Sequence, residues 1–91
     1  MAQWGLLSYG ENDVFATRFG FTIPKYVGNA VTRNRLRRWG REHFRKTQIE
    51  LGSIDINVVF LKKSFDFYKE LSKADFDTAL GKALGKIRES A

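Results

Sequence analysis

The sequence predicts one α+β domain over residues 1–91, a two-layer sandwich in which two helices pack on one face of a three-stranded sheet. The expected order is β-β-α-β-α, and three observations predict it. The 91 residues are enough for one hydrophobic core and too few for two. Apolar residues alternate with period two in Val14–Ile23 and Ile54–Leu61, as in strands. Segments 29–47 and 72–87 carry apolar stripes at helical spacing, and such helices need a surface to cover.

The first two strands are predicted at Gln3–Tyr9 and Val14–Ile23, with a turn at Gly10–Asp13 between them. So short a connection favours an antiparallel hairpin. Pro24 ends the second strand because it has no amide hydrogen to donate to a sheet. The aromatic face of the second strand consists of Phe15, Thr17, Phe19, Phe21 and Ile23. This face is either part of the core or the floor of a groove.

The first helix is predicted to begin after Asn29, a favoured N-cap residue, with Gly28 permitting the sharp entry. At about 100° per residue, its apolar arc contains Leu36, Trp39, Gly40, His43, Phe44 and Thr47. The opposite arc contains Asn34, Arg37, Arg38, Arg41 and Arg45. Like charges four residues apart oppose the helix by roughly 0.2–0.5 kcal/mol per pair, and a bound anion would relieve this repulsion.

A break at Gly52-Ser53 precedes the third strand, Ile54–Leu61, and a polar loop is predicted over Lys62–Lys69. The last helix is predicted to begin after Ser72, with Asp75 as a capping-box-like partner three residues later. The apolar stripe of this helix consists of Phe76, Ala79, Leu80, Ala83, Leu84 and Ile87.

Positive charge is concentrated in the segment Lys25–Lys46. The segment holds eight basic residues and one acid, Glu42, which gives 8 − 1 = +7, whereas the rest of the chain has eight basic and nine acidic residues. Most of these cations are arginines, whose planar guanidinium donates paired hydrogen bonds to phosphate and stacks on bases. Solvated helix faces usually mix both signs of charge. The pattern therefore indicates a surface for structured nucleic acid.

The composition argues against several other classes. With no cysteine, the chain can form neither disulfides nor thiolate metal sites, and a reducing cytosol is compatible with it. No apolar run approaches the ~20 residues of a membrane span and no leader opens the chain, so we expect a cytoplasmic protein with no membrane partner. The one histidine, His43, lies in the apolar arc and is expected in the core, while Asp75 and Asp77 suit the acidic first turn of a helix. We expect neither a catalytic site nor a metal site in the protein itself.

The stretch Arg18–Arg45 closely resembles the bacterial ribonuclease P protein subunit. The signature of that family is a lysine-containing loop followed by G-N-A-V-x-R-N-R-x-(K/R)-R-x-x-R-(E/Q), and here it runs from Lys25 through Gly28 to Glu42. From about Gln3 onward, the remaining elements also follow the order of the family. The resemblance implies a small α/β sandwich with a left-handed β-α-β crossover, although right-handed crossovers are the general rule.

The resemblance also implies a function. Members of the family are partners of a catalytic RNA that removes 5′ leaders from precursor tRNA, and that RNA carries out the hydrolysis with bound Mg²⁺. The protein would be a monomer that binds no cofactor tightly, with the catalytic RNA and precursor tRNA as its partners. The residues expected to bind RNA are Lys25, Asn29, Arg33, Asn34, Arg35, Arg37, Arg38, Arg41, Arg45, Lys62 and Lys63. For Lys62 and Lys63, a phosphate contact and a simple solvated turn are equally open.

A cleft for the single-stranded leader is expected on the aromatic side of the sheet, where stacking tolerates any base. Its candidates are Trp4, Tyr9, Phe15, Phe19 and Phe21. For Trp4 and Tyr9, packing and base stacking are equally open, whereas core packing is favoured for most of the three phenylalanines.

Some features depart from the family pattern. The helix that usually precedes the first strand and forms one wall of the leader cleft is absent, so leader binding is expected to be weakened more than binding to the catalytic RNA. Tyr26 stands where a second lysine is common. Gly40 interrupts the helix at a cost of about 1 kcal/mol relative to Ala, and either loosens it or lets it approach the sheet closely. Gly81 and Gly85 have no explanation beyond the close approach of a partner.

Two other functions compete with this one. One is a ribosomal or other structural RNA-binding protein, and the other is a DNA-binding module that lays the arginine-rich helix in the major groove. The major groove of A-form RNA is too deep and narrow for a helix to read, so an RNA contact would follow phosphates and shape. Discrimination between DNA duplexes would therefore favour the DNA-binding alternative.

Overall fold

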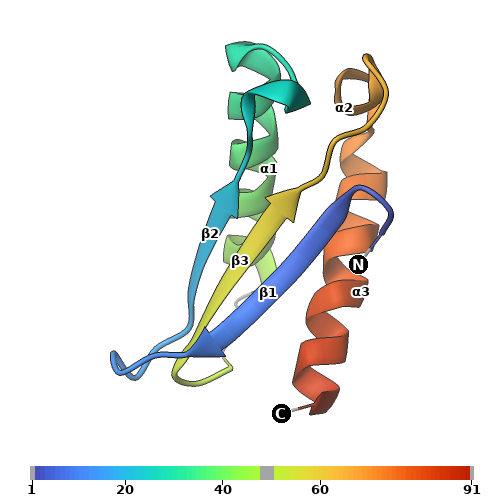
Figure 1. Ribbon diagram of the computed structural model, residues 1–91. Helices are drawn as coiled ribbons and strands as arrows, with labels where there is room; N and C mark the ends of the chain where they lie inside the picture. The colour runs from blue at the N-terminus through green and yellow to red at the C-terminus, as the bar shows by residue number, and fades with distance from the viewer. Residues whose placement is uncertain (1, 48–50, 91) are drawn as a thin grey trace.

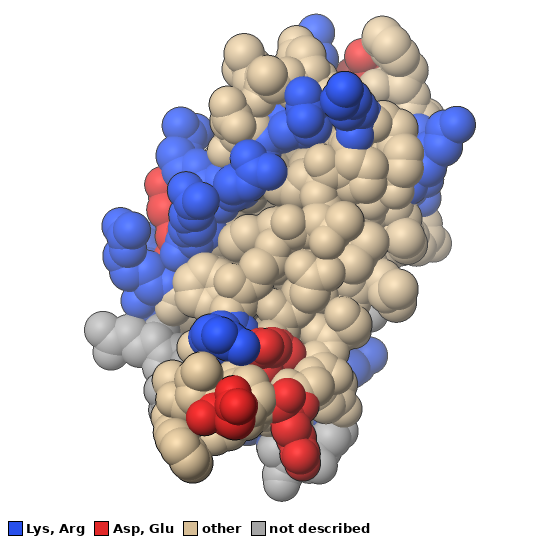
Figure 2. All heavy atoms as spheres, turned by 60° about the vertical axis from the view of Figure 1, so that its left-hand side comes forward, with Lys and Arg blue, Asp and Glu red and all other residues tan. Residues whose placement is uncertain are grey.

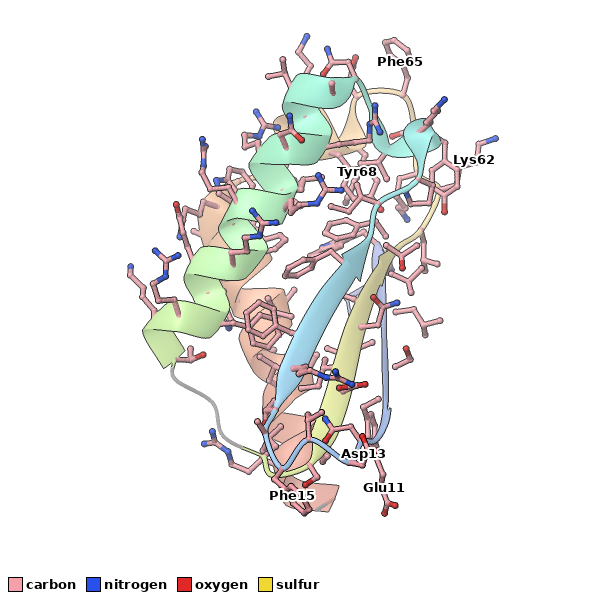
Figure 3. All side chains as sticks on the ribbon, turned by 90° about the vertical axis from the view of Figure 1, so that its left-hand side faces the viewer. Glu11, Asp13, Phe15, Lys62, Phe65 and Tyr68 are labelled. Carbon is pink, nitrogen blue, oxygen red and sulfur yellow. The ribbon has the colours of Figure 1, made fainter. Side chains whose placement is uncertain are left out.

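The computed structural model describes residues 2–47 and 51–90, and it has two layers. The strands form one layer, and the two long helices lie side by side against one face of it (Figures 1 and 3). The elements in chain order are β1 (Gly5–Glu11), β2 (Arg18–Thr22), the 3-10 turn η1 (Lys25–Val27), α1 (Ala30–Thr47), β3 (Ile54–Phe60), α2 (Phe67–Glu70) and α3 (Lys73–Ser90). The predicted α+β sandwich is confirmed, whereas the short helix α2 begins within the predicted loop Lys62–Lys69 and ends one residue beyond it.

The strand order in the sheet is β1-β3-β2, so the predicted hairpin between the first two strands was wrong. Strand β3 lies in the centre, antiparallel to β1 and parallel to β2. It is the most apolar strand, and its side chains Ile56, Val58 and Phe60 are buried. The two more exposed strands occupy the edges because burying β3 between them removes more apolar surface from water.

Asn12 explains why β1 and β2 are not joined by a tight turn. Its side-chain amide donates to the carbonyl of Ala16 and to Asp55, and its side-chain oxygen accepts from the amide of Val14. These bonds hold a wide loop in which Phe15 has a positive φ of 59°. The second strand consequently begins at Arg18 instead of Val14, and the first continues to Glu11 through the predicted turn.

The connection from β2 through α1 to β3 is left-handed. In Figure 1 the chain rises along β2, descends along α1 behind the sheet, and rises again along β3 to the right of β2. The side view in Figure 3 has the helices and the sheet in the same relation. The hand that the family resemblance implied is confirmed, against the general preference for right-handed crossovers.

Both long helices begin at the predicted caps. The amide of Thr32 donates to Oδ1 of Asn29 over 2.9 Å, and the amide of Asp75 donates to Oγ of Ser72 over 3.1 Å. Each cap satisfies one of the amides that a helix start leaves without a partner. The stripe of α3 is buried as predicted, except that Ala79 is half-buried.

An aromatic cluster closes the core at the end of the sheet where β1 begins. The indole of Trp4 stacks on Phe60 and on Phe76, with ring centroids 5.4 and 5.5 Å apart. The hydroxyl of Tyr68 lies between the carbonyl oxygens of Trp4 and Leu61, and burial raises the pKa of that hydroxyl well above its usual value. Tyr68 thereby fastens α2 to the ends of two strands.

Candidate nucleic-acid interface

The outer face of α1 is an exposed, almost purely cationic surface. Its inner face buries Leu36, Gly40, His43 and Phe44, as the helical wheel predicted. Trp39 is half-buried, whereas Thr47 is exposed, contrary to its predicted position in the apolar arc. The outer face carries Asn34, Arg38, Arg41 and Arg45, which are exposed, and Arg37, which is half-exposed. We call these five residues the arginine face; Figure 2 shows basic side chains in a band along this side of the molecule.

Few contacts within the protein restrain the arginine face. The side chains of Arg41 and Arg45 make no hydrogen bond or ion pair with the described part of the chain. Arg37 donates to Oδ1 of Asn34 over 3.3 Å. Arg38 lies 3.9 Å from the carboxylate of Glu42, an exposed pair that contributes little to stability. Most of the guanidinium donors on this face therefore remain available to a phosphate.

Arg33 and Arg35 lie differently, because each donates hydrogen bonds to backbone carbonyls of its own protein. Arg35 donates to the carbonyls of Tyr68 and Lys69 over 3.0 and 3.1 Å, and its guanidinium lies 5.2 Å from the centre of the Trp39 ring. Arg33 donates to the carbonyl of Gly28 over 3.1 Å. All the arginines of the signature were predicted to bind RNA. The structure distinguishes Arg33 and Arg35 from the arginine face, and Arg35 ties α1 to α2.

The three lysines outside α1 that were predicted to bind RNA lie at one end of the sheet. Strands β2 and β3 are parallel, so Lys25 after β2 and Lys62 and Lys63 after β3 follow the same ends of neighbouring strands. The hydroxyl of Tyr26 donates to the carbonyl of Phe60 over 2.9 Å and ties the two segments together. Lys25 and Lys62 are exposed, while the ammonium of Lys63 lies 5.5 Å from the Phe67 ring centre.

The aromatic candidates for the leader cleft lie in different surroundings, and only Tyr9 and Phe19 line one hollow. Trp4 is only 4 % exposed and belongs to the core. Of packing and base stacking, the two alternatives for Trp4, the structure therefore shows packing. Phe19 and Phe21 face α1, where Phe19 stacks on Phe44 with centroids 4.1 Å apart. Phe15 is exposed in the loop between β1 and β2, at the end of the molecule that Figure 3 labels with Glu11 and Asp13. Helix α1 covers only part of the aromatic face of β2, because Phe19 remains 42 % exposed.

A hollow of about 490 Å³ lies on the sheet, lined by all three strands. Its lining consists of Ser8, Tyr9, Gly10, Arg18, Phe19, Gly20, Asp55, Ile56 and Asn57. Most of these residues alternate with the ones that face the helices, which puts the hollow on the open face of the sheet. Arg18 crosses it in a two-bond contact with Asp55 at 2.7 and 2.8 Å, and this contact is the main cause of a lowered pKa at Asp55. Arg18 and Asp55 were not among the residues predicted from the sequence, because the leader cleft was inferred from the aromatic residues alone.

An ionic cluster joins α1 to α3 and explains the buried histidine. Nδ1 of His43 lies 3.1 Å from Oδ1 of Asp77, and Lys73 donates to Oδ2 of Asp77 over 2.9 Å. A carboxylate can only accept, so Nδ1 carries the proton. Burial pushes the pKa of Asp77 up, but the bonds from Lys73 and His43 outweigh it, and the pKa lies below its usual value. The predicted core position of His43 is confirmed, and the arginine face thus stands on a firmly packed helix.

Charge is distributed unevenly over the molecule. Basic side chains cover α1 and the end of the molecule where α1 begins, and acidic ones gather at the opposite end (Figure 2). Within residues 2–47 and 51–90, no helix is long and apolar enough to cross a membrane. A polyanion would therefore meet an attractive potential along α1 and a repulsive one at the loop that carries Glu11 and Asp13.

The sequence and the structure are both similar to known proteins. A family profile described as Ribonuclease P matches residues 3–88. The chain is 37 % identical over 89 residues to the ribonuclease P protein component of Citrifermentans bemidjiense, covering 96 % of this chain and 72 % of that relative. It is 41 % identical over 73 residues to the corresponding protein of Geobacter sp. strain M21, covering 80 % and 60 %.

Among solved structures, the fold is similar to the RNase P protein of Thermotoga maritima in complex with 1-(4-fluorophenyl)-2-thiourea. The TM-score is 0.81 at 25 % identity, covering 92 % of this chain and 79 % of that one. The chain thus spans only part of the length of each of these relatives, about three fifths in the Geobacter protein.

Proposed function

The chain belongs to the ribonuclease P protein family, and from that membership we propose that it is the protein subunit of a ribonuclease P particle, bound to the catalytic RNA through the arginine face. The observation that carries the proposal is that most guanidinium donors on that face have no partner among the described residues. The side chains of Arg41 and Arg45 make no hydrogen bond or ion pair with the described residues, although they stand on a helix whose other side is buried in the core. Five cationic or amide side chains on a rigid support suit the regular spacing of phosphates on a folded RNA.

In this proposal the protein assists a reaction that the RNA performs. Each guanidinium that contacts a phosphate displaces condensed counterions and neutralises part of the repulsion within the folded RNA. Magnesium ions serve the same purpose, so the protein should lower the concentration of Mg²⁺ that the particle needs. In residues 2–47 and 51–90, no group of three or more His, Cys, Asp or Glu side chains could hold a metal ion. In this proposal, RNA groups hold the Mg²⁺ of the reaction.

Precursor tRNA is the second partner in the proposal. The lysines at the ends of β2 and β3 would contact backbone phosphates of the substrate, and the hollow on the open face of the sheet offers a concave surface for an extended leader. The lining of that hollow includes the aromatic rings of Tyr9 and Phe19 as well as Arg18, so the leader could contact it through both bases and backbone.

A reconstitution assay tests the proposed function. Cleavage of precursor tRNA by a cognate catalytic RNA is measured over a range of Mg²⁺ concentrations, with and without the complete chain. We expect the protein to shift the curve to lower Mg²⁺. No shift, with tight binding to ribosomal RNA or to particular DNA duplexes instead, would support one of the two competing functions.

A further inference from the structure

Three apolar side chains are left in solvent at the end of the molecule where α1 begins. Phe65 is 97 % exposed, Val31 is 75 % exposed and Tyr26 is 49 % exposed. They come from three separate segments: the loop between β3 and α2, the first turn of α1, and η1. All three line a single hollow of about 730 Å³, which we call the Phe65 pocket. Scattered exposed apolar residues are ordinary, but a group around a concavity indicates contact with a ligand.

The charges around the Phe65 pocket favour an anionic occupant. Lys25, Arg35 and Lys69 line it, and Asp66 is the one acid among its lining residues. An apolar peptide would gain nothing from three cations around its binding site. A nucleotide uses both kinds of group, because its base stacks on an aromatic ring while its phosphates approach the cations.

We propose that the Phe65 pocket receives an unpaired nucleotide of the catalytic RNA, with the base stacked on Phe65 and the flanking phosphates near Lys25 and Lys69. The proposal rests on the function proposed above and adds a second kind of contact to it. The arginine face binds by charge and is indifferent to whether the RNA is paired. An exposed aromatic ring can stack only on a base that has left its helix.

The position of the pocket favours the catalytic RNA over the leader. The pocket includes Val31, Thr32 and Arg35 of α1, the helix that carries the arginine face. It shares no lining residue with the hollow on the open face of the sheet. In Figure 3, Phe65 projects from the end of the molecule at the start of α1, far from the acidic loop with Glu11 and Asp13. An RNA lying along the arginine face therefore reaches Phe65 by following one helix.

The test measures the affinity of the complete chain for a cognate catalytic RNA by filter binding at several salt concentrations. Phe65→Ala should weaken binding by about tenfold, since base stacking on a protein aromatic contributes at that level. The salt dependence should stay unchanged because no charge is removed. Phe65→Trp should retain the affinity. Val14→Ala, which truncates an exposed apolar residue in the loop between β1 and β2, is the matched control and should have no effect.

The outcomes separate the two proposals. If the unaltered chain does not bind the catalytic RNA, the proposed function fails, and this inference fails with it. If the unaltered chain binds and Phe65→Ala binds equally well, the pocket proposal alone is overturned. It is also overturned if Phe65→Ala leaves this affinity intact and instead reduces the preference of the assembled particle for precursor over mature tRNA, because the occupant is then the leader.

Discussion

The ring of Phe21 occupies the space that a side chain at Gly40 would fill. A Cβ atom at position 40 would lie 2.4 Å from both Cε1 and Cζ of that ring, far inside van der Waals contact. The ring cannot easily withdraw, because it packs against Phe19 and Phe44 with centroids 6.0 and 6.1 Å away. Of the two roles that the sequence left open for Gly40, close approach of the helix to the sheet is therefore the one observed.

Gly40→Ala should destabilise the protein, although alanine is the better helix former. The substitution gains about 1 kcal/mol of helix propensity and loses roughly 1–3 kcal/mol through overpacking. We expect a net loss of about 1 kcal/mol in the free energy of unfolding, measured by urea denaturation. In the Phe21→Leu background the same substitution should cost less. A stabilising effect of Gly40→Ala alone would contradict the packing described above.

The two glycines of α3 should respond in the opposite way. A Cβ atom at Gly81 would lie 3.8 Å from Cε1 of His43, an ordinary contact, and one at Gly85 would meet no atom within 4 Å. The group that approaches Gly81 therefore belongs to the same chain, at His43. We expect Gly81→Ala and Gly85→Ala each to stabilise the protein by up to about 1 kcal/mol. Thermal unfolding of these two variants and of Gly40→Ala would test whether the space available for a Cβ atom decides if the substitution stabilises or destabilises the protein.

The double substitution Arg37→Ala plus Arg41→Ala should weaken binding to the catalytic RNA and leave the fold intact. Removing two phosphate contacts is expected to flatten the slope of log K against log salt by roughly one to two units. Lys82→Ala plus Arg88→Ala removes the same charge from exposed positions on α3 and serves as the control. Equal effects of the two pairs would mean that overall charge matters and the arginine face does not. Loss of folding in the first pair would mean that these arginines are structural.

Arg35→Ala should reduce stability as well as binding, unlike substitutions on the arginine face. It removes two hydrogen bonds to backbone carbonyls of α2 and the contact with Trp39, for an expected loss of about 1–2 kcal/mol. Arg35→Lys should recover little of it, because an ammonium cannot reproduce the planar fork or its stacking. The measurement is urea denaturation of the free protein. Full stability of Arg35→Ala would show that the link between α1 and α2 is unimportant.

Asp77→Asn should make the protein less sensitive to acid. The pKa of Asp77 is lower in the folded than in the unfolded state, where it is about 3.9. Its ion cluster therefore contributes stability that is complete above about pH 5 and is lost as the pH falls through the folded-state pKa. We expect Asp77→Asn to be less stable than the unaltered protein at pH 6 and to differ little from it at pH 2. Asp75→Asn, in the same helical turn, controls for the helix dipole, and an equal effect there would contradict the prediction.

The sequence determined by itself those features that depend on neighbours along the chain. Asn29 and Ser72 form caps within one helical turn, and the spacing of Leu36, Gly40 and Phe44 assigns the inner face of α1, so both could be recognised locally. The arginine face followed as the complement of that inner face. The family signature supplied the left-handed crossover, which local preferences would have predicted with the opposite hand.

Only the tertiary structure decided which strands pair and which arginines are available. The hairpin prediction failed because β3 offers each edge strand a more apolar partner than the other edge strand does. The hydrogen bond from Asn12 to Asp55 of β3 joins residues 43 positions apart in the sequence. Arg35 and Arg38 both stand at plain arginine positions of the signature, yet only Arg35 meets the carbonyls of α2, which lie more than 30 residues away. Contacts between residues so distant in sequence depend on how the layers pack, and no local pattern in the chain encodes them.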